Sequence, residues 1–477
     1  MDVSSPSAQG VDAAGISAFL DVIESHPGIE PHGLIVHRHG KRIAEGYWAP
    51  HTGDRSRLVY SLSKSFTGTA LGLLVGDGRL SLDDLVGDHL PELFDDATPD
   101  AIRRLRIRHI ASMASGHAAE TLLDAFVADP DDPVRGFLTL APDAEPGTIF
   151  AYNQPPVLTL ARILERVAGA RLVDELRHRV LDPIGAGDLR WRQLAGHDMG
   201  FSGVFTNLDT IARLGQLHLD DGTWSGRRIL PEGWVAMASS VQTPNGDWDQ
   251  VDWQQGYGFQ FWMSRHGYRG DGAFGQFMVI LPEQDMVVAM FSCTDDMQVV
   301  LDALWEHVLP AVDHDPARSP DADEALAERM ANLALPTAAA RRGGAAPGDV
   351  GARRFVRSES EPSHFTITAV DTDGSTLTVH EGEGSEGEGS EGEGSEGEGP
   401  VTLPLTTRWN VAGSIATSAT RLDDGRIAVD VAFLHTPHRL EIELDPATET
   451  FVARWPLMPL FGVGADARLA SLRSLPD

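Results

Sequence analysis

Ser61 and Lys64 are the residues whose types and spacing most directly suggest chemistry. They stand in the run Ser61-Leu62-Ser63-Lys64, and Lys64 is one of only two lysines among the 38 lysine and arginine residues. A lysine amine can lose its proton when it is removed from water, whereas a guanidinium stays charged. Residues three apart share a helix face, so the amine would lie beside the hydroxyl and accept its proton during attack on a carbonyl carbon.

The residues after Lys64 favour this catalytic interpretation. The stretch 66–75 is apolar and rich in small residues, which predicts a buried helix. A charged lysine at the start of such a helix would be costly unless it is neutral or paired. The alternative is a serine that caps the helix, followed by a solvated lysine one turn later.

Length and composition limit the classes of function. A chain of 477 residues with 42% hydrophobic residues predicts two or three globular domains. A net charge of -32 argues against nucleic acid or an anionic membrane as partner, because phosphate binding needs clustered Lys and Arg. The single cysteine, Cys293, the lack of a signal peptide and the lack of a bilayer-length apolar run predict a cytoplasmic protein. The sequence indicates no oligomeric state.

The order of expected elements predicts an α+β fold. Strands are expected at 33–39 and 42–48, a mostly helical region at about 80–220, further strands at 256–262, 275–281 and 286–292, and a helix at 301–312. Strands from both ends of this region would form one antiparallel sheet flanked by helices, with an inserted α subdomain. The predicted catalytic domain therefore spans residues 1–312.

The remainder of the chain predicts a second domain of another kind. Residues 313–348 are rich in Asp, Pro, Ala and Gly and indicate a linker. Residues 349–477 contain consecutive hairpin patterns, which predict an antiparallel β-barrel or sandwich. Within it, the Glu/Gly/Ser repeats of 381–399 carry eight glutamates and no apolar residue, so we expect an extended loop.

Common cofactor and metal signatures do not fit. There is no His-Glu-x-x-His motif, no set of cysteine ligands, no phosphate-binding loop and no Gly-x-Ser-x-Gly elbow. The glycine pattern at 270–275 precedes a strand instead of a helix, so it does not predict a dinucleotide site. His37 and His39 are interpreted as two strand histidines beside a turn. We therefore expect neither a metal nor a cofactor.

Tyr152 marks a second candidate position for chemistry. It is one of five tyrosines and stands in a turn, 146–154, just before a predicted helix. A phenol beside a lysine ammonium can have its pKa lowered and can relay a proton. The alternative is a tyrosine that only anchors the loop.

Four stretches together resemble the serine hydrolases of the class C β-lactamase, penicillin-binding-protein and family VIII esterase group. The stretches are Ser61–Lys64, 108–116, the turn 146–152 and Gly272–Gln276, and they occur in the order of that group over about residues 10–312. The resemblance implies a β-lactamase-like fold with its active site between the sheet and the α subdomain. It implies that Ser61 is the acylated nucleophile, Lys64 its base and Tyr152 the group that passes the proton to the leaving group. The oxyanion donors would be the main-chain N–H groups of Ser61 and Ala273.

The second motif departs from the pattern of that group. Its usual form is Tyr-x-Asn, whereas this chain has Tyr152-Asn153-Gln154, so Gln154 would present the amide one methylene further out. We expect Asn153 and Gln154 to contact substrate. Among the aromatic residues ahead of the third motif, Trp253 and Tyr257 are the best candidates for a pocket wall; core packing is the alternative.

The third motif departs as well. Its usual form is Lys or His, a small residue and Gly, whereas this chain has Gly270-Asp271-Gly272. The cation that would bind a β-lactam carboxylate is missing unless Arg269 replaces it. An acid at Asp271 would repel a carboxylate substrate, so Asp271 and Gly272 are expected beside a neutral or cationic ester or amide.

The sequence thus predicts a serine hydrolase, an esterase or amidase, that acts on a small molecule through an acyl-Ser61 intermediate. One alternative is a peptidase similar to D-aminopeptidases, or a penicillin-binding peptidase or β-lactamase. An alternative of another class is a non-catalytic ligand-binding protein on the same fold. The C-terminal domain resembles the lipocalin-like β domains that follow the catalytic domain in some D-aminopeptidases.

Overall fold

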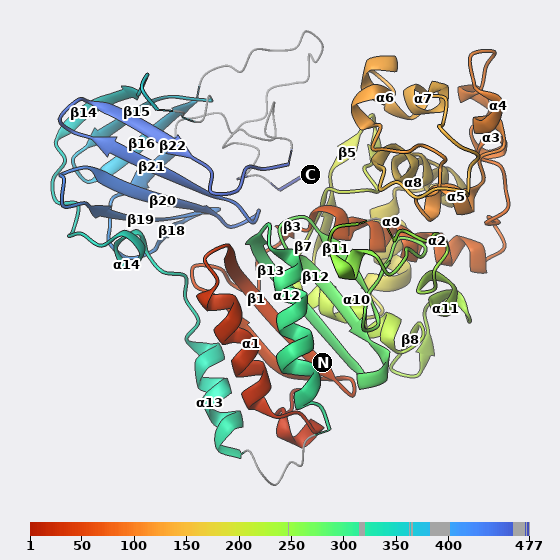
Figure 1. Cartoon of the computed structure of the whole chain (residues 1–477), viewed down its shortest axis with the longest axis horizontal. Helices are drawn as coiled ribbons and strands as arrows, with labels where there is room; N and C mark the ends of the chain where they lie inside the picture. The colour runs from red at the N-terminus through yellow and green to blue at the C-terminus, as the bar shows by residue number, and fades with distance from the viewer. Residues whose placement is uncertain are drawn as a thin grey trace. The chain divides into compact units, whose positions relative to one another are not determined.

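The computed structural model describes residues 1–246, 248–313, 320–361, 363, 366–381, 401–460, 473, 475 and 476. These residues form two compact units (Figure 1). The first unit comprises Met1–Gly46, Leu58–Ala331 and Pro476–Asp477, and the second comprises Tyr47–Arg57 and Asn332–Leu475.

The first unit is built on a six-stranded sheet of order β10-β11-β12-β13-β1-β2. The strands are β1 (Ile29–Arg38), β2 (Lys41–Tyr47), β10 (Trp262–Met263), β11 (Tyr268–Gly272), β12 (Gln276–Leu281) and β13 (Met286–Thr294). The central pair β1–β13 is antiparallel, with Ile35 opposite Ala289. Strands from the beginning and the end of the unit therefore share one sheet, which confirms the predicted α+β class.

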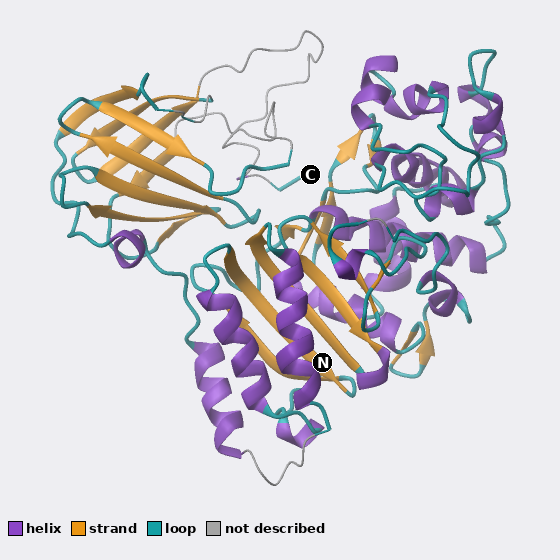
Figure 2. Cartoon of the chain, in the orientation of Figure 1, coloured by secondary structure: helices purple, strands orange, loops and turns teal. Residues whose placement is uncertain are grey.

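Helices cover this sheet (Figure 2). Every residue of β12 and β13 is buried, as expected for strands with both faces covered. Helix α10 (Leu208–Leu219) packs on β12 and β13, and α1 (Ala13–Ser25) packs on β1. Helices α12 (Met297–Ala303) and α13 (Pro320–Ala331) pack against α1.

The segment between the two groups of strands is mostly helical, as predicted. Its helices are α2 (Ser63–Gly76), α3 (Val86–His89), α4 (Asp100–Arg103), α5 (Ile107–Ala111), α6 (Leu122–Ala128), α7 (Pro133–Thr139), α8 (Gln154–Ala168), α9 (Leu172–Leu176), α10 and α11 (Trp234–Ala238). Short strands interrupt them: β3 (Arg57–Leu58), β4 (Leu189–Trp191), β5 (Gln193–Leu194), β6 (His197–Asp198), β7 (Val204–Thr206), β8 (Thr223–Trp224) and β9 (Arg227–Arg228). Helix α8 has prolines in its first turn and ends at Gly169 with φ 74°, which are common start and stop signals.

The strand predicted at 256–262 is wrong. Only Trp262 and Met263 form a strand, β10, and Tyr257 makes isolated bridges to Thr243 and Trp262, because the backbone bends at Gly256 (φ 99°) and at Gln260 (φ 67°). Gly258 N–H donates to Phe261 O at 2.8 Å across this bend. The apolar residues of this stretch are buried all the same, which explains why a strand was expected.

The second unit is a nine-stranded, barrel-like sheet of order β17-β16-β15-β14-β22-β21-β20-β19-β18. The strands are β14 (Ala352–Arg357), β15 (Ile367–Asp373), β16 (Thr376–Glu381), β17 (Val401–Pro404), β18 (Asn410–Ala412), β19 (Ile415–Arg421), β20 (Ile427–Phe433), β21 (Arg439–Asp445) and β22 (Thr450–Arg454). Neighbours are antiparallel except β14 and β22, which are parallel. This sheet confirms the predicted β-rich second part.

Two predicted segments are only partly described. Of the repeats at 381–399, only Glu381, the last residue of β16, lies within the described residues. The predicted linker 313–348 contains α13 and α14 (Ala338–Arg342), and its residues 314–319 are outside the described ranges. Across the described part of the chain, no helix combines the length and the hydrophobicity that a bilayer crossing requires.

Candidate active site

Ser61 lies in a tight turn that leads directly into a buried helix. The 3-10 turn Tyr60–Leu62 continues into α2, and Tyr60 has a left-handed backbone with φ 48°. Ser63 Oγ stabilises the turn, because it donates a hydrogen bond to Tyr60 O at 2.6 Å and accepts one from Val204 N at 3.0 Å. Ser61 is partly exposed while the helix behind it is buried. Strained backbone of this kind is frequent at functional sites.

The Lys64 amine lies between the Ser61 hydroxyl and two neutral acceptors. Its Nζ is 3.2 Å from Ser61 Oγ, 2.7 Å from Gln154 Oε1 and 2.8 Å from Phe201 O, and the side chain is 1% exposed. Burial lowers the pKa of Lys64 to about 7, although the charges of Asp271 and Glu120 oppose this shift. The solvated-lysine alternative is therefore wrong, and the amine can accept a proton near neutral pH.

Tyr152 joins this pair from the turn before α8. Lys64 Nζ lies 4.6 Å from the centre of its ring, and the ring stacks on Trp262 with centroids 5.0 Å apart. The expectation that its pKa is lowered is wrong. Burial, with the negative charge of Asp271, raises the pKa of Tyr152, and a hydrogen bond with Ser61 only partly opposes this. The phenol therefore stays protonated at neutral pH and can donate a proton.

Ala273 begins the turn between β11 and β12 and lies against the segment that carries the nucleophile. A Cβ on Gly272 would be 2.0 Å from Val59 O, so only glycine allows this close approach. Gln276 Nε2 fixes the turn by donating to Ala273 O at 3.3 Å. The main-chain N–H groups of Ser61 and Ala273 are thus held on neighbouring segments.

The two amides of the second motif point in different directions. Gln154 Oε1 accepts from Lys64, as given above, so this side chain lies at the nucleophile. Asn153 is fully buried, and its Oδ1 accepts from Thr121 N at 3.0 Å and Thr121 Oγ1 at 3.1 Å. Asn153 therefore supports the loop before α6, whereas Gln154 faces the reacting groups.

Arg269 and Asp271 of the third motif bind each other. Arg269 Nε lies 2.8 Å from Asp271 Oδ2, and the two residues are 0% and 6% exposed. Arg269 Nη1 also donates to Asp252 O at 2.9 Å and Met263 O at 3.1 Å. An enclosed guanidinium in this position is not open to a substrate carboxylate.

The aromatic residues that were predicted to line a pocket pack behind the site and do not form an open pocket wall. Trp253 stacks on the Arg269 guanidinium at 4.2 Å, and Tyr257 lies perpendicular to Trp262 with centroids 4.9 Å apart. Both Trp253 and Tyr257 are buried. The cluster reaches the surface at Trp248, which is 38% exposed and lies 5.5 Å from Trp262.

Glu120 is a site residue that the sequence analysis missed. It is exposed, and its Oε1 accepts from Leu122 N at 2.9 Å and from Gln154 N at 3.3 Å. Its charge raises the pKa of Lys64. No motif surrounds Glu120, so only the tertiary fold brings it to the nucleophile.

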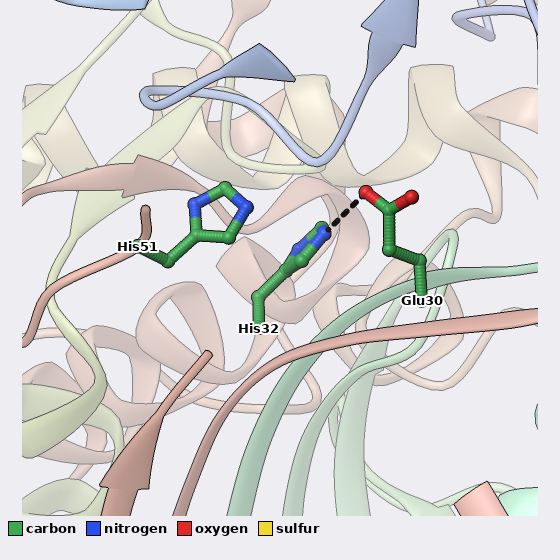
Figure 3. A group of neighbouring side chains, drawn as sticks. All are labelled: Glu30, His32 and His51. Carbon is green, nitrogen blue, oxygen red and sulfur yellow. Dashed lines mark hydrogen bonds and ion pairs between the residues drawn. The ribbon is translucent and has the colours of Figure 1, made fainter. Parts of the chain in front are cut away.

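Possible metal ligands in the first unit lie on β1. His32 Nε2 is 3.1 Å from Glu30 Oε1 (Figure 3). His51, also labelled in Figure 3, belongs to the second unit. Two ligands from one unit fall short of the three that a catalytic zinc site needs.

The fold is that of the β-lactamase-like serine hydrolases, and Ser61, Lys64 and Tyr152 lie together in it. The model of the beta-lactamase family matches residues 23–312, so the chain belongs to that family.

Relatives carry several activities in their names. The chain is 27% identical over 288 residues to a 6-aminohexanoate-dimer hydrolase of Paenarthrobacter ureafaciens, a match that covers 55% of this chain and 72% of the relative. It is 27% identical over 271 residues to penicillin-binding protein 4 of Amycolatopsis lactamdurans, covering 49% and 70%. A putative β-lactamase structure from Bacteroides dorei DSM 17855 has a TM-score of 0.54 at 18% identity, covering 63% of this chain and 99% of that one, and supports the fold alone.

Proposed function

We propose that the protein hydrolyses an ester or amide bond of a neutral or cationic small molecule through an acyl-Ser61 intermediate. The observation that carries this proposal is the Lys64 amine. It is buried, has a pKa of about 7 and lies 3.2 Å from Ser61 Oγ. A lysine held in this way can act as the base of a serine nucleophile.

In the acylation step, Ser61 Oγ attacks the carbonyl carbon while its proton moves to Lys64 Nζ. The carbonyl π electrons move to the oxygen, which becomes an oxyanion. The main-chain N–H groups of Ser61 and Ala273 would bind that oxyanion, each contributing about 3 kcal/mol in the transition state.

Expulsion of the leaving group needs a proton. Tyr152 supplies it from its phenol, and the Lys64 ammonium returns a proton to Tyr152. A water molecule then attacks the acyl carbon, the same groups take its proton, and Ser61 leaves as the free hydroxyl. The raised pKa of Tyr152 supports its role as a proton donor.

The charges around Lys64 support the proposed substrate class. Both Asp271 and Glu120 act on Lys64 as negative charges, while Arg269 is enclosed by its own partners. A substrate carboxylate would meet negative charge without an open cation, which disfavours it. Neutral or cationic esters and amides avoid this penalty.

The proposal is tested by the mass of the intact protein after reaction with three compounds. These are a fluorophosphonate, a chromogenic short-chain ester and a penicillin. We expect a fluorophosphonate adduct on the wild type and turnover of the ester, with neither in Ser61→Ala. The matched control is Ser65→Ala, which removes another α2 hydroxyl, bonded to Gln260 O at 3.3 Å, and should keep both.

The other outcomes separate the alternatives. A lasting penicillin adduct on Ser61 would identify a penicillin-binding enzyme instead. No adduct with any reagent on folded wild-type protein would overturn the proposed function and favour a ligand-binding role.

A further inference from the structure

A buried ion pair lies next to the nucleophile, and the proposed steps do not use it. Arg269 and Asp271 stand two positions apart on β11. Arg269 Nε lies 2.8 Å from Asp271 Oδ2, and both side chains are almost completely buried. Arg269 Nη1 makes a further bond to Ser264 Oγ at 2.5 Å, beyond its two carbonyl partners. Burying such a pair costs desolvation energy and is weak evidence of added stability. Stability alone therefore does not account for the pair.

Strand β11, which contains Arg269 and Asp271, packs closely against the segment that contains Ser61. A Cβ on Gly270 would lie 2.3 Å from Ser65 Oγ, and one on Gly272 would lie 2.0 Å from Val59 O. The backbone of β11 thus contacts the residues on either side of Ser61. Asp271 lies between these two glycines on the same strand.

Trp262 connects Asp271 to Tyr152. In the β10–β11 pair it stands opposite Arg269, and its interaction with Asp271 and with Tyr152 lowers the pKa of each of these two groups. Its ring also stacks on Tyr152 at an interplanar angle of 25°. Trp262 therefore packs on Tyr152 and neighbours Asp271, which places the carboxylate close to the phenol.

The Asp271 carboxylate acts electrostatically on both proton-transfer groups. Its charge raises the pKa of Lys64 and of Tyr152, and Glu120 is the second charge that acts on Lys64. The groups in hydrogen-bond contact with the amine are uncharged: Ser61 Oγ, Gln154 Oε1 and Phe201 O. Among the described residues, no carboxylate contacts an ammonium formed there, so charges further away affect its stability.

We propose that Asp271 is a positioning residue that stabilises the Lys64 ammonium formed when Ser61 is acylated, and that Arg269 holds Asp271 in place. This inference rests on the proposed acylation of Ser61. In that step the proton passes from Ser61 Oγ to Lys64 Nζ as the new Oγ bond forms, and Asp271 takes up no proton. Together with burial, the Asp271 charge also favours the protonated form of Tyr152.

The test measures how fast a fluorophosphonate labels Ser61 at pH values from 5 to 9, in the full-length protein. For the wild type we expect the rate to rise with pH around a midpoint near 7, because only the neutral amine accepts the Ser61 proton. In Asp271→Asn, the loss of the negative charge lowers the pKa of Lys64, so the midpoint should move down by about one unit. The plateau should also fall by about tenfold or more, because the ammonium is less stable.

Controls separate charge from structure. Asp124→Asn removes an exposed carboxylate on α6 and should leave the profile unchanged. Asp271→Ser, which is smaller and neutral, should reproduce the shift seen with Asn. The inference is overturned if a folded neutral variant keeps the wild-type midpoint. It is also overturned if neither variant folds, because the ion pair would then serve only to stabilise the fold. No labelling of the wild type would refute the proposed function instead.

Discussion

Two regions of the molecule bury charged side chains in opposite ways. In the first unit, Lys64 is 1% exposed, and the atoms in contact with its amine are neutral oxygens. In the second unit, Asp430 on β20 is fully buried, but Arg341 lies at 2.5 Å and Arg439 at 3.5 Å. The first arrangement lowers the pKa of the amine towards neutrality, whereas the second surrounds an acid with permanent cations.

This difference separates a charged group that is available for proton transfer from one that stabilises the fold. Burial raises the pKa of Asp430, and both arginines oppose that shift, so the acid is held by opposite charges. Arg341 also binds Glu441 at 3.0 Å, which joins α14 to β21. A charge without a contacting counter-ion is available for proton transfer, while a paired one fixes neighbouring elements.

The largest effect on turnover is expected for Tyr152→Phe. Without the phenol, a leaving group that needs a proton is expelled about 10²- to 10⁴-fold more slowly. The loss should be much smaller for a substrate whose leaving group departs as an anion, such as a nitrophenyl ester. The measurement is kcat/KM for a nitrophenyl ester and for an alkyl ester of the same acid. An equal loss for both would contradict the role of Tyr152 as proton donor.

The largest effect on stability is expected for Arg341→Leu in the second unit. This change leaves the buried Asp430 carboxylate with one cation at 3.5 Å, and breaking such a pair costs about 3 kcal/mol in the free energy of unfolding. The matched control is Arg342→Leu, whose partners Glu441 and Glu443 are partly exposed, with an expected cost of about 1 kcal/mol. Denaturant unfolding measures both. Equal costs would show that burial of the partner does not matter here.

A moderate effect is expected at Gln154. Gln154→Leu removes the acceptor 2.7 Å from Lys64 Nζ and should slow acylation by about tenfold, about 1.4 kcal/mol. Gln154→Glu instead places a carboxylate on the amine, which raises the pKa of Lys64. The midpoint of the rate–pH profile should then move to higher pH, opposite in sign to Asp271→Asn. A shift in the same direction would refute this electrostatic account of Lys64.

The smallest effect is expected for Glu120→Gln at the exposed edge of the site. The comparison uses two esters that differ only in a free or an acetylated amine. Loss of the exposed carboxylate should reduce the kcat/KM ratio between the amine and acetylated forms about fivefold, about 1 kcal/mol. Asp124→Asn carries the same charge change and should keep the ratio. If both variants change it equally, the preference reflects net charge and not Glu120.

The sequence predicted the α+β fold and the serine–lysine arrangement because both depend on short-range patterns. The strand patterns, the apolar stretch that forms the helix after Lys64 and the scarcity of lysine can all be read directly from the sequence. The segment 256–262 shows where this fails, because positive φ values at Gly256 and Gln260 bend a stretch whose composition suits a strand. Burial alone does not distinguish a bent segment from a strand.

The environment of the site could not be predicted in the same way. The raised pKa of Tyr152 depends on burial and on the charge of Asp271, which is 119 positions later in the sequence and is brought near by the sheet. Glu120 meets Gln154 across a loop without a motif. Arg269 can pair with Asp271 because the two residues stand two positions apart on β11. They are buried because other residues pack over them. Electrostatics at the site thus depends on tertiary contacts that no local pattern encodes.

The central claim is that Lys64 acts as a base, and Lys64→Arg tests it most directly. The measurement is the rate of Ser61 labelling by a fluorophosphonate at pH 8, for the wild type, Lys64→Arg and Lys64→Ala, with the fold checked by thermal unfolding. Since a guanidinium keeps its proton, we predict that the arginine variant is as inactive as the alanine variant. Substantial labelling of folded Lys64→Arg would show that a positive charge suffices, and would contradict the assignment of Lys64 as the base.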